Sequence, residues 1–219
     1  AGAGQRPHGV ARHLAYAGDH AWLVEAFTRL AEATGRAAWI GEARAAADAL
    51  IDLFWDESSR VFATTGRDAE TLIARPVDTQ DGALPSANSV AAGALLRLAG
   101  LTGVDRYRHH AEAVVASMGP ALGAAPVAFT GMVAVAELAR TGVTEVAVTG
   151  PRPDLLEVVR ARYLPGAVLA WGEPYDSPLW EGRTGPDTAG LAFVCRDYTC
   201  EAPVREPSEL AAQLLVPVT

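Results

Sequence analysis

The chain has 219 residues, and half of them are hydrophobic, which is enough for a buried core and excludes a disordered polypeptide. Its formal net charge is −8 and no cluster of basic residues occurs along it, so neither a nucleic acid nor an anionic membrane is an expected partner. All 18 basic residues are Arg, and the absence of Lys excludes a Schiff base, a pyridoxal-phosphate anchor and a P-loop from this chain.

The beginning of the chain does not resemble a targeting segment. No charged region leads from Ala1 into an apolar core, so no signal peptide is predicted. The longest apolar stretch, 121–129, contains Gly and Pro and is far shorter than the roughly 20 residues of a membrane-spanning helix. We therefore expect a soluble, cytoplasmic protein, and a chain that is a piece of a longer polypeptide.

Two helices are predicted first, over 19–34 and 37–55. In the first helix, apolar residues recur three and four positions apart between Ala21 and Ala31, and they form a single stripe. The second helix spreads its apolar residues over one face and ends in the polar cluster that follows Trp55. Both patterns are typical of helices that pack along one side.

A small β-hairpin is predicted next, because the apolar runs 61–65 and 72–74 flank a Gly-Arg-Asp turn. A further helix follows and ends at Leu101. Either Ser86 or Asn88 caps this helix, since a short polar side chain can accept hydrogen bonds from the free N–H groups of a first turn.

A repeat relates the helices to one another. The pattern Arg-Leu-Ala followed by Thr-Gly in 29–35 recurs in 97–103, and a partner helix over 105–118 then matches the second helix of the first copy. Each copy is typical of a helical hairpin. A third, shortened copy ends at 137–142, where a β-like run replaces the partner helix.

The C-terminal part has the pattern of a small α/β unit. Strands and helices alternate there, and a long loop rich in Pro, Gly and acidic residues, 172–190, lies before the last strand. The predicted fold is therefore mainly α, with helical hairpins over 1–142 and an α/β annex over 143–219. The expected strands are 143–149, 168–171 and 191–195, and the expected helices are 153–164 and 207–214.

No cofactor is predicted. Gly150 follows a strand and precedes a helix, but one glycine is not a dinucleotide fingerprint, and Pro151 and Pro153 remove N–H donors from that loop. Cys195 and Cys200 are too few ligands for a zinc site, so no metal is predicted. Buried reduced thiols are the default for this pair, and a disulfide across a tight turn or redox exchange with a thioredoxin-like partner are the alternatives.

Stacked hairpins with matching connections place the starts of their first helices at one end of the array. Asp19 and His20 precede the first helix, and Asp81 and Asn88 belong to the segment that leads into the second. We expect these side chains to share one rim and to border a pocket. The alternative is that Asp19, Ser86 and Asn88 only cap helices, which requires no ligand.

Three segments resemble the C-terminal part of thioredoxin-domain proteins similar to spermatogenesis-associated protein 20. They are Asp-His-Ala at 19–21, Asp-Gly-Ala-Leu-Pro-Ser-Ala-Asn-Ser-Val-Ala-Ala at 81–92, and Val-Cys-Arg-Asp-Tyr-Thr-Cys-Glu-Ala-Pro at 194–203. The resemblance covers almost the whole chain. His20 stands where that family usually has Tyr.

The resemblance implies a partial (α/α) toroid, similar to six-hairpin glycosidases and N-acylglucosamine 2-epimerase, behind a thioredoxin-like domain that this chain lacks. Toroid enzymes of this kind bind sugars at the ends of their inner helices, where carboxylates or histidines act as acid and base. By this resemblance, a sugar epimerase, isomerase or glycoside hydrolase would use Asp19, His20 and Asp81 as catalytic groups. The residues that would contact the substrate are Asn88, Ser86, Trp22 and Tyr16.

A second hypothesis assigns no catalysis to these residues. The toroid would then be a scaffold, or a redox partner, that supports the thioredoxin-like domain, with Cys195 and Cys200 as exchange partners. Apolar side chains that fill the mouth would favour this hypothesis. Trp22 and Tyr16 would then contribute to packing, which is the more common function of aromatic residues at helical spacing.

Overall fold

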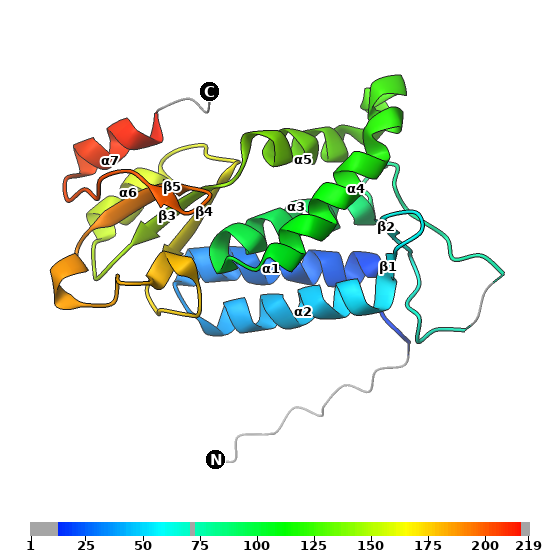
Figure 1. Ribbon diagram of the computed structural model, residues 1–219, viewed down its shortest axis with the longest axis horizontal. Coiled ribbons are helices and arrows are strands. Elements are labelled where there is room, and N and C mark those ends of the chain that lie inside the picture. Colours follow the sequence, from blue (N-terminus) through cyan, green and yellow to red (C-terminus); the bar gives the residue numbers. More distant parts are fainter. Residues whose placement is uncertain (1–12, 71–72, 216–219) are drawn as a thin grey trace, which may run out of the picture.

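The computed structural model of the chain describes residues 13–70 and 73–215, and the folded part is mainly helical (Figure 1). A layer of helices lies at one end and a four-stranded sheet with two helices at the other. The helices of the first part are α1 (Ala17–Thr34), α2 (Ala38–Phe54), α3 (Ala87–Thr102), α4 (Asp105–Ala124), the 3₁₀ turn η1 (Pro126–Phe129) and α5 (Thr130–Thr141).

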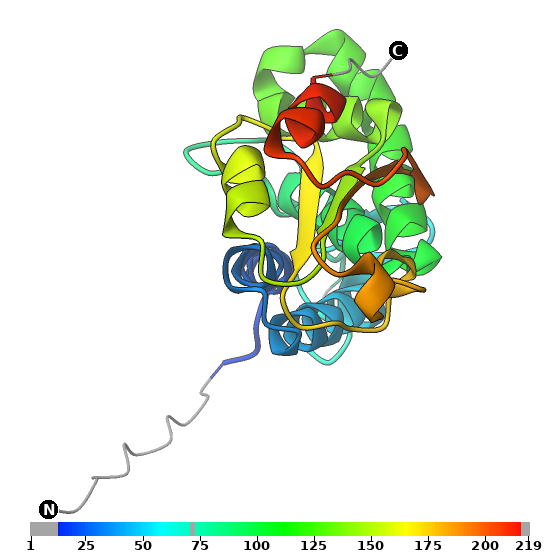
Figure 2. The ribbon, with the colours of Figure 1, turned by 90° about the vertical axis from the view of Figure 1, so that its left-hand side faces the viewer.

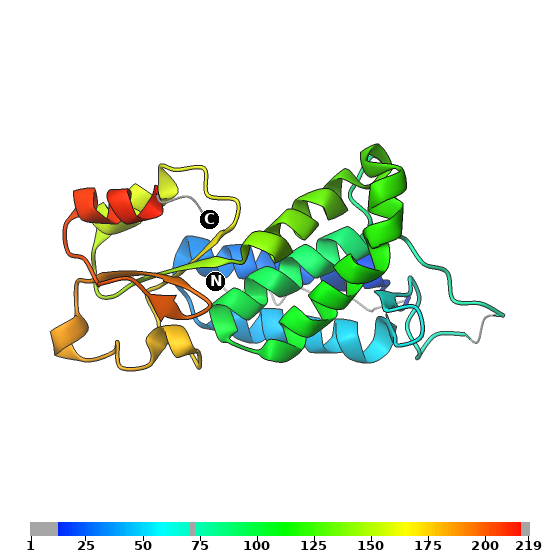
Figure 3. The same cartoon turned by 45° about the horizontal axis from the view of Figure 1, so that its top comes forward.

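Three of these helices run in the same direction. Figures 1 and 3 show α1, α3 and α5 beginning at the end of the molecule far from the sheet and ending beside it, whereas α2 and α4 run back. At the far end, Gly18 of α1 lies against Ala87 of α3, because a Cβ at Gly18 would be 3.8 Å from the Cβ of Ala87. The starts of the repeated helices therefore lie together, as the repeat in the sequence leads one to expect.

The three Thr-Gly pairs at the ends of the three parallel helices share two features. The hydroxyls of Thr34, Thr102 and Thr141 donate to the carbonyl oxygen four residues earlier, at 2.6, 2.7 and 2.9 Å. The glycine that follows each of them has a φ between +66° and +77°, which an L side chain rarely adopts. A local sequence signal thus produces the turn from each first helix.

The predicted β-hairpin of 61–65 with 72–74 is wrong about its strand pairing. β2 (Val61–Phe62) pairs antiparallel with β1 (Trp55–Asp56), which directly follows α2. Ala63 forms a single bridge with Val77, and residue 72 lies outside the described residues. The preceding segment was the nearer partner in sequence, and a short turn at 57–60 is enough to bring the two strands together.

The C-terminal part is the predicted α/β unit with one additional strand. The sheet has the order β4-β3-β5-β6, in which β3 and β4 are parallel and the other pairs antiparallel. α6 ends four residues earlier than predicted, and β6 was not predicted because it has two residues only. The elements are β3 (Thr144–Val148), α6 (Pro153–Arg160), β4 (Ala167–Trp171), η2 (Pro178–Trp180), η3 (Pro186–Thr188), β5 (Ala192–Arg196), β6 (Thr199–Cys200) and α7 (Pro207–Leu214).

Each face of the sheet is covered by a different set of helices. Val146, Leu169 and Val194 form one buried cluster with residues of α6 and α7, and Figure 2 shows these two helices in front of the sheet. On the opposite face, Ala147 and Phe193 belong to the same buried cluster as α1 to α4. The helical part and the α/β part therefore share one hydrophobic core.

Candidate functional site

A groove of about 530 Å³ lies between the three parallel helices α1, α3 and α5 and the segment 163–166. Gly93 forms part of its floor, and there α3 and α5 are so close that a Cβ at this position would be 3.2 Å from Val135. Trp22 of α1 lines the groove and remains 45% exposed, and Tyr163, which is 91% exposed, also borders it. The groove thus has a mainly apolar floor and two accessible aromatic rings.

Charged side chains border the same groove. Glu25 and Arg29 on α1 form an ion pair at 2.7 Å, and both line the groove. Arg97 of α3 lines it as well, and its guanidinium donates to both carboxylate oxygens of Glu32 at 2.8 Å. Arg29 lies 3.5 Å from the same carboxylate, so the two arginines that match in the repeat share one partner.

The Glu32–Arg97 pair also connects the groove to the sheet. Arg97 donates to the carbonyl oxygen of Pro165, and Glu32 accepts the backbone N–H of Leu169 in β4 at 3.0 Å. The Trp171 indole donates to the backbone oxygen of Glu32 at 2.6 Å. Glu32 and Trp171 therefore bond the end of α1 to β4, and Arg97 bonds α3 to the segment before β4.

The predicted residues at the start of α1 lie outside the groove lining, apart from Trp22. Asp19 is exposed, and its Oδ2 accepts the backbone N–H of Tyr16 at 2.8 Å. Tyr16 is itself 55% exposed at the residue before the helix. His20 is half-buried, and its ring lies 5.3 Å from the ring of Phe54.

Asp81 connects the loop before α3 to the start of α5. Its carboxylate accepts the backbone N–H groups of Ser86 at 2.9 Å and of Gly131 at 2.6 Å. The hydroxyl of Ser89 donates to it at 3.2 Å. Ser86 caps α3 by accepting the N–H of Ser89, which agrees with the predicted capping at this residue. Asp81 also borders a hollow of about 340 Å³ that shares Pro85 and Gly131 with the groove.

Asn88 is fully buried and bonded to backbone groups. Its Oδ1 accepts the N–H of Phe62 at 2.8 Å, and its Nδ2 donates to the carbonyl oxygens of Phe62 and Asp78. This amide therefore holds β2 and the lead-in loop against the first turn of α3. Of the predicted residues, the structure brings Trp22 into the groove and Asp81 beside it, whereas Asn88 is buried and His20 packs beside Phe54.

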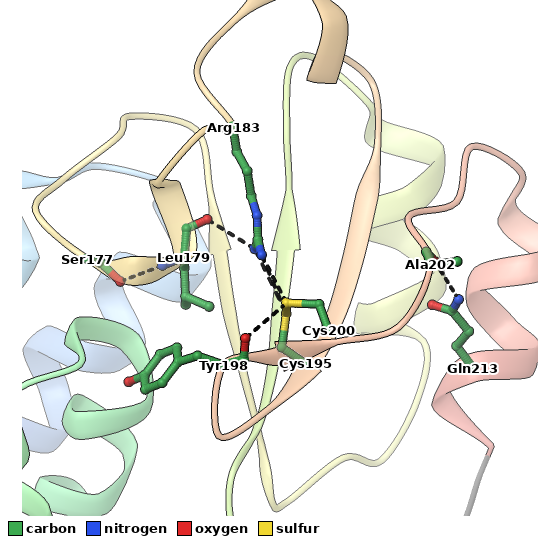
Figure 4. Close-up of a disulfide and its surroundings, with 8 residues drawn as sticks. All are labelled: Ser177, Leu179, Arg183, Cys195, Tyr198, Cys200, Ala202 and Gln213. Atoms are coloured by element: carbon green, nitrogen blue, oxygen red, sulfur yellow. Dashed lines mark hydrogen bonds between the residues drawn. A yellow bond between two sulfur atoms is a disulfide. The ribbon is translucent and has the colours of Figure 1, made fainter.

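Cys195 and Cys200 form a disulfide between β5 and β6, so the expected reduced thiols are not what the structure contains. Arg183, from the long loop before β5, donates to the sulfur of Cys200 at 2.9 Å (Figure 4). Glu145 of β3 is fully buried and lies opposite Cys195 in the sheet register. Glu145 could have been noticed in the sequence, because it is the charged residue of an otherwise uncharged strand.

The described residues contain no group of three or more His, Cys, Asp or Glu side chains arranged to hold a metal ion. Among the helices of residues 13–70 and 73–215, none is both long and apolar enough to span a membrane. The sequence pointed to Arg29 and Arg97 only as members of the repeat and did not point to Arg183, and the roles of these charged residues became visible through their partners.

No protein-family model matches the chain. Human spermatogenesis-associated protein 20 is 30% identical over 205 residues, which are 88% of this chain and 26% of the human protein. The chain is homologous to spermatogenesis-associated protein 20. The rat protein of the same name is 29% identical over 205 residues, and an uncharacterized protein of Caenorhabditis elegans is 24% identical over 207.

The chain spans about a quarter of the length of these relatives, from 26% of the human protein to 28% of the Caenorhabditis elegans protein. Whatever the remainder of such a protein contributes therefore lies outside this chain. The match includes most of the helical part and the α/β part together, since it covers 88% of the sequence.

Proposed function

We propose that this chain is part of an (α/α) toroid that binds a carbohydrate in a longer protein related to spermatogenesis-associated protein 20. The parallel arrangement of α1, α3 and α5, with α2 and α4 running back, supports the toroid, because inner helices of a toroid are parallel and outer helices return. The chain supplies two complete hairpins and the first helix of a third. The rest of the ring, and a thioredoxin-like domain, would come from the longer protein.

The groove between the parallel helices is the observation on which this proposal depends. A sugar ring has an apolar face that packs on an aromatic ring, and Trp22 offers such a ring within the groove. Sugar hydroxyls form charge-assisted hydrogen bonds with carboxylates and guanidinium groups, which Glu25 and Arg29 supply beside the indole. A groove of about 530 Å³ has the size of a typical small-ligand site.

The geometry supports binding more than conversion of the sugar. An acid–base function for Asp81 would require a free carboxylate, whereas this one accepts two backbone N–H groups and a hydroxyl. Asp19 is also bonded, to the backbone of Tyr16. Catalysis by Asp19, His20 and Asp81 stays a prediction, and in this proposal Asp81 shapes the end of the groove.

The test is a titration of the full chain with a panel of mono- and disaccharides, followed by the indole fluorescence and by calorimetry. We expect at least one saccharide to bind and Trp22→Ala to weaken it about tenfold, because one stacking contact is lost. Leu23→Ala removes an exposed neighbour that does not line the groove, and it serves as the matched control. Equal affinity of Trp22→Ala and wild type, or no binding by either, contradicts the proposal.

A non-catalytic scaffold is the second candidate, and the backbone bonds of Asp19, Asp81 and Asn88 favour it. α1 also exposes Leu23 and Leu30, at 44% and 38%, which would pack against the preceding part of the longer protein. In that case Leu30→Glu lowers the unfolding midpoint of the full-length protein and leaves that of this chain unchanged. Equal midpoints for wild-type and variant full-length proteins would exclude the scaffold contact.

A further inference from the structure

Three side chains form a row across the sheet on the face that meets the helices. Glu145 of β3 pairs directly with Cys195 of β5, and Cys195 pairs directly with Cys200 of β6. Directly paired residues point to the same face, and their Cβ atoms are about 5 Å apart. The carboxyl group of Glu145 is therefore the cross-strand neighbour of the Cys195 side of the disulfide.

The two sulfur-bearing residues differ in access. Cys195 is fully buried, whereas Cys200 is half-buried near the β5–β6 turn. The guanidinium of Arg183 lies 2.9 Å from the sulfur of Cys200 and 3.9 Å from that of Cys195. An attacking group thus reaches Cys200 first, and a positive charge already faces the sulfur that it reaches.

Arg183 is held in this position by other contacts. Its guanidinium donates to the carbonyl oxygen of Leu179 at 3.2 Å and lies over the Phe193 ring, 4.2 Å from the centroid. Figure 4 shows it extending from the loop toward the disulfide. Within the described residues this guanidinium has no carboxylate partner, so its charge is available to a thiolate.

Glu145 is a buried acid whose oxygens have no hydrogen-bond partner in standard geometry among the described residues. Burial raises the pKa of Glu145 to about 7, and the backbone N–H of Tyr198 opposes the rise. The carboxylate of Asp197 raises it further, and Arg108 of α4 lowers it. Glu145 therefore holds a proton that it can give up near neutral pH.

We propose that Cys195–Cys200 is a redox-active disulfide that accepts two electrons from a dithiol, with Glu145 as proton donor to Cys195 and Arg183 stabilising the Cys200 thiolate. This inference is independent of the carbohydrate groove. A purely structural disulfide has no need of the other two groups, and this one joins strands that the turn already holds together, with only four residues between the cysteines in sequence.

Reduction of the disulfide by the dithiol takes place in two steps. A thiolate of the dithiol attacks the sulfur of Cys200, its bond to Cys195 breaks, and the electron pair leaves with Cys195. The carboxyl proton of Glu145 passes to that sulfur and gives a thiol. The second thiol of the donor loses its proton to the Glu145 carboxylate and attacks its own mixed disulfide, which releases Cys200 as a thiolate beside Arg183. The donor loses two electrons and two protons, of which one ends on Cys195 and one in solvent.

The first test is the rate of reduction of the full chain by dithiothreitol between pH 5 and 9, followed by thiol release and expressed per dithiothreitol thiolate. In wild type this rate constant falls as the pH rises through about 7, because ionised Glu145 cannot donate. Glu145→Gln removes the pH dependence and lowers the rate at pH 6 by about tenfold or more. The exposed neighbour Glu201 provides the charge-matched control, since Glu201→Gln should keep the wild-type profile.

The second test uses a different residue, so that it stands even where Glu145→Gln does not fold. In the reduced chain, ultraviolet absorbance of the thiolate should show a Cys200 pKa about one unit higher in Arg183→Gln than in wild type. Arg140→Gln, on an exposed helix face, is the matched control and should change nothing. A disulfide that dithiothreitol reduces only in urea, or a Cys200 pKa unaffected by Arg183→Gln, overturns the proposal.

Discussion

Asn88 shows how a polar residue can hold two segments together without contacting a ligand. It is fully buried, and its amide uses one acceptor and two donor bonds, all to the backbone. An amide is suited to this position because it offers both kinds of group at once, which neither a carboxylate nor a hydroxyl does in the same geometry. The chemistry that suggested a substrate-orienting residue is here used for the fold.

Asn88→Ala should lower the free energy of unfolding by about 2 to 4 kcal/mol, because it leaves the N–H and C=O of Phe62 buried without partners. Asn88→Asp should be worse at pH 7, since its carboxylate would face two carbonyl oxygens. Urea denaturation measures both variants. Gln80→Ala, in the exposed part of the same loop, is the control and should remain within about 0.5 kcal/mol of wild type.

An Asn88→Ala variant as stable as wild type would return this residue to the list of ligand contacts. Asp81 is used in a similar way, since its carboxylate bonds Ser86 and Ser89 at the start of α3 and Gly131 at the start of α5. In both residues most of the partners are backbone groups, so the side chain is used to hold segments together.

At the scale of elements, the close approach of α3 to the sheet depends on a glycine. Gly100 lies in the last turn of α3, where a Cβ would be 2.7 Å from Val143 and 3.4 Å from Val168. A side chain at this position would push α3 away from β3 and β4. Gly41 in α2 provides a comparison, because no atom lies within 4 Å of the place that its Cβ would take.

The substitution of alanine should therefore have opposite effects at these two glycines. Gly100→Ala should cost about 1 to 3 kcal/mol through overpacking against Val143. Gly41→Ala should add about 1 kcal/mol, because alanine is the better helix former and meets no neighbour. Thermal unfolding of the two variants measures the difference, and a destabilised Gly41→Ala would show that this argument from space and helix propensity is wrong.

At the scale of the whole molecule, one buried ion pair joins three elements. Glu32 of α1 and Arg97 of α3 have side chains that are 11% and 5% exposed, and Glu32 also bonds the backbone of β4. An ion pair that is removed from water stabilises only where its hydrogen bonds are satisfied, and both partners here have several. The pair helps to orient the helical part relative to the sheet.

Glu32→Gln should destabilise the chain by about 3 to 5 kcal/mol, because it leaves the buried guanidinium of Arg97 without a counter-charge. Glu137→Gln is the matched control: it breaks an exposed pair with Arg140 and should cost less than about 1 kcal/mol. Urea unfolding distinguishes the two. A loss of similar size in both variants would show that burial does not determine the strength of the Glu32 pair.

The helices and their ends could be predicted from the sequence, because the signals are local. Apolar residues at helical spacing and a Thr-Gly pair act within one or two turns, and they gave α1, α3 and the turns after them close to their observed bounds. The cap at Ser86 follows from the same kind of signal. The repeat, in turn, implied that the starts of α1 and α3 lie together.

What depends on distant partners was decided by the tertiary structure. The bonds of Asn88 to Phe62 and the pairing of Glu145 with Cys195 join segments whose separations no local pattern encodes. Arg183 meets the disulfide from a loop that has no regular pattern. Sequence spacing determines how a segment folds, whereas burial and hydrogen bonding between segments determine which side chains meet, and so where chemistry can occur.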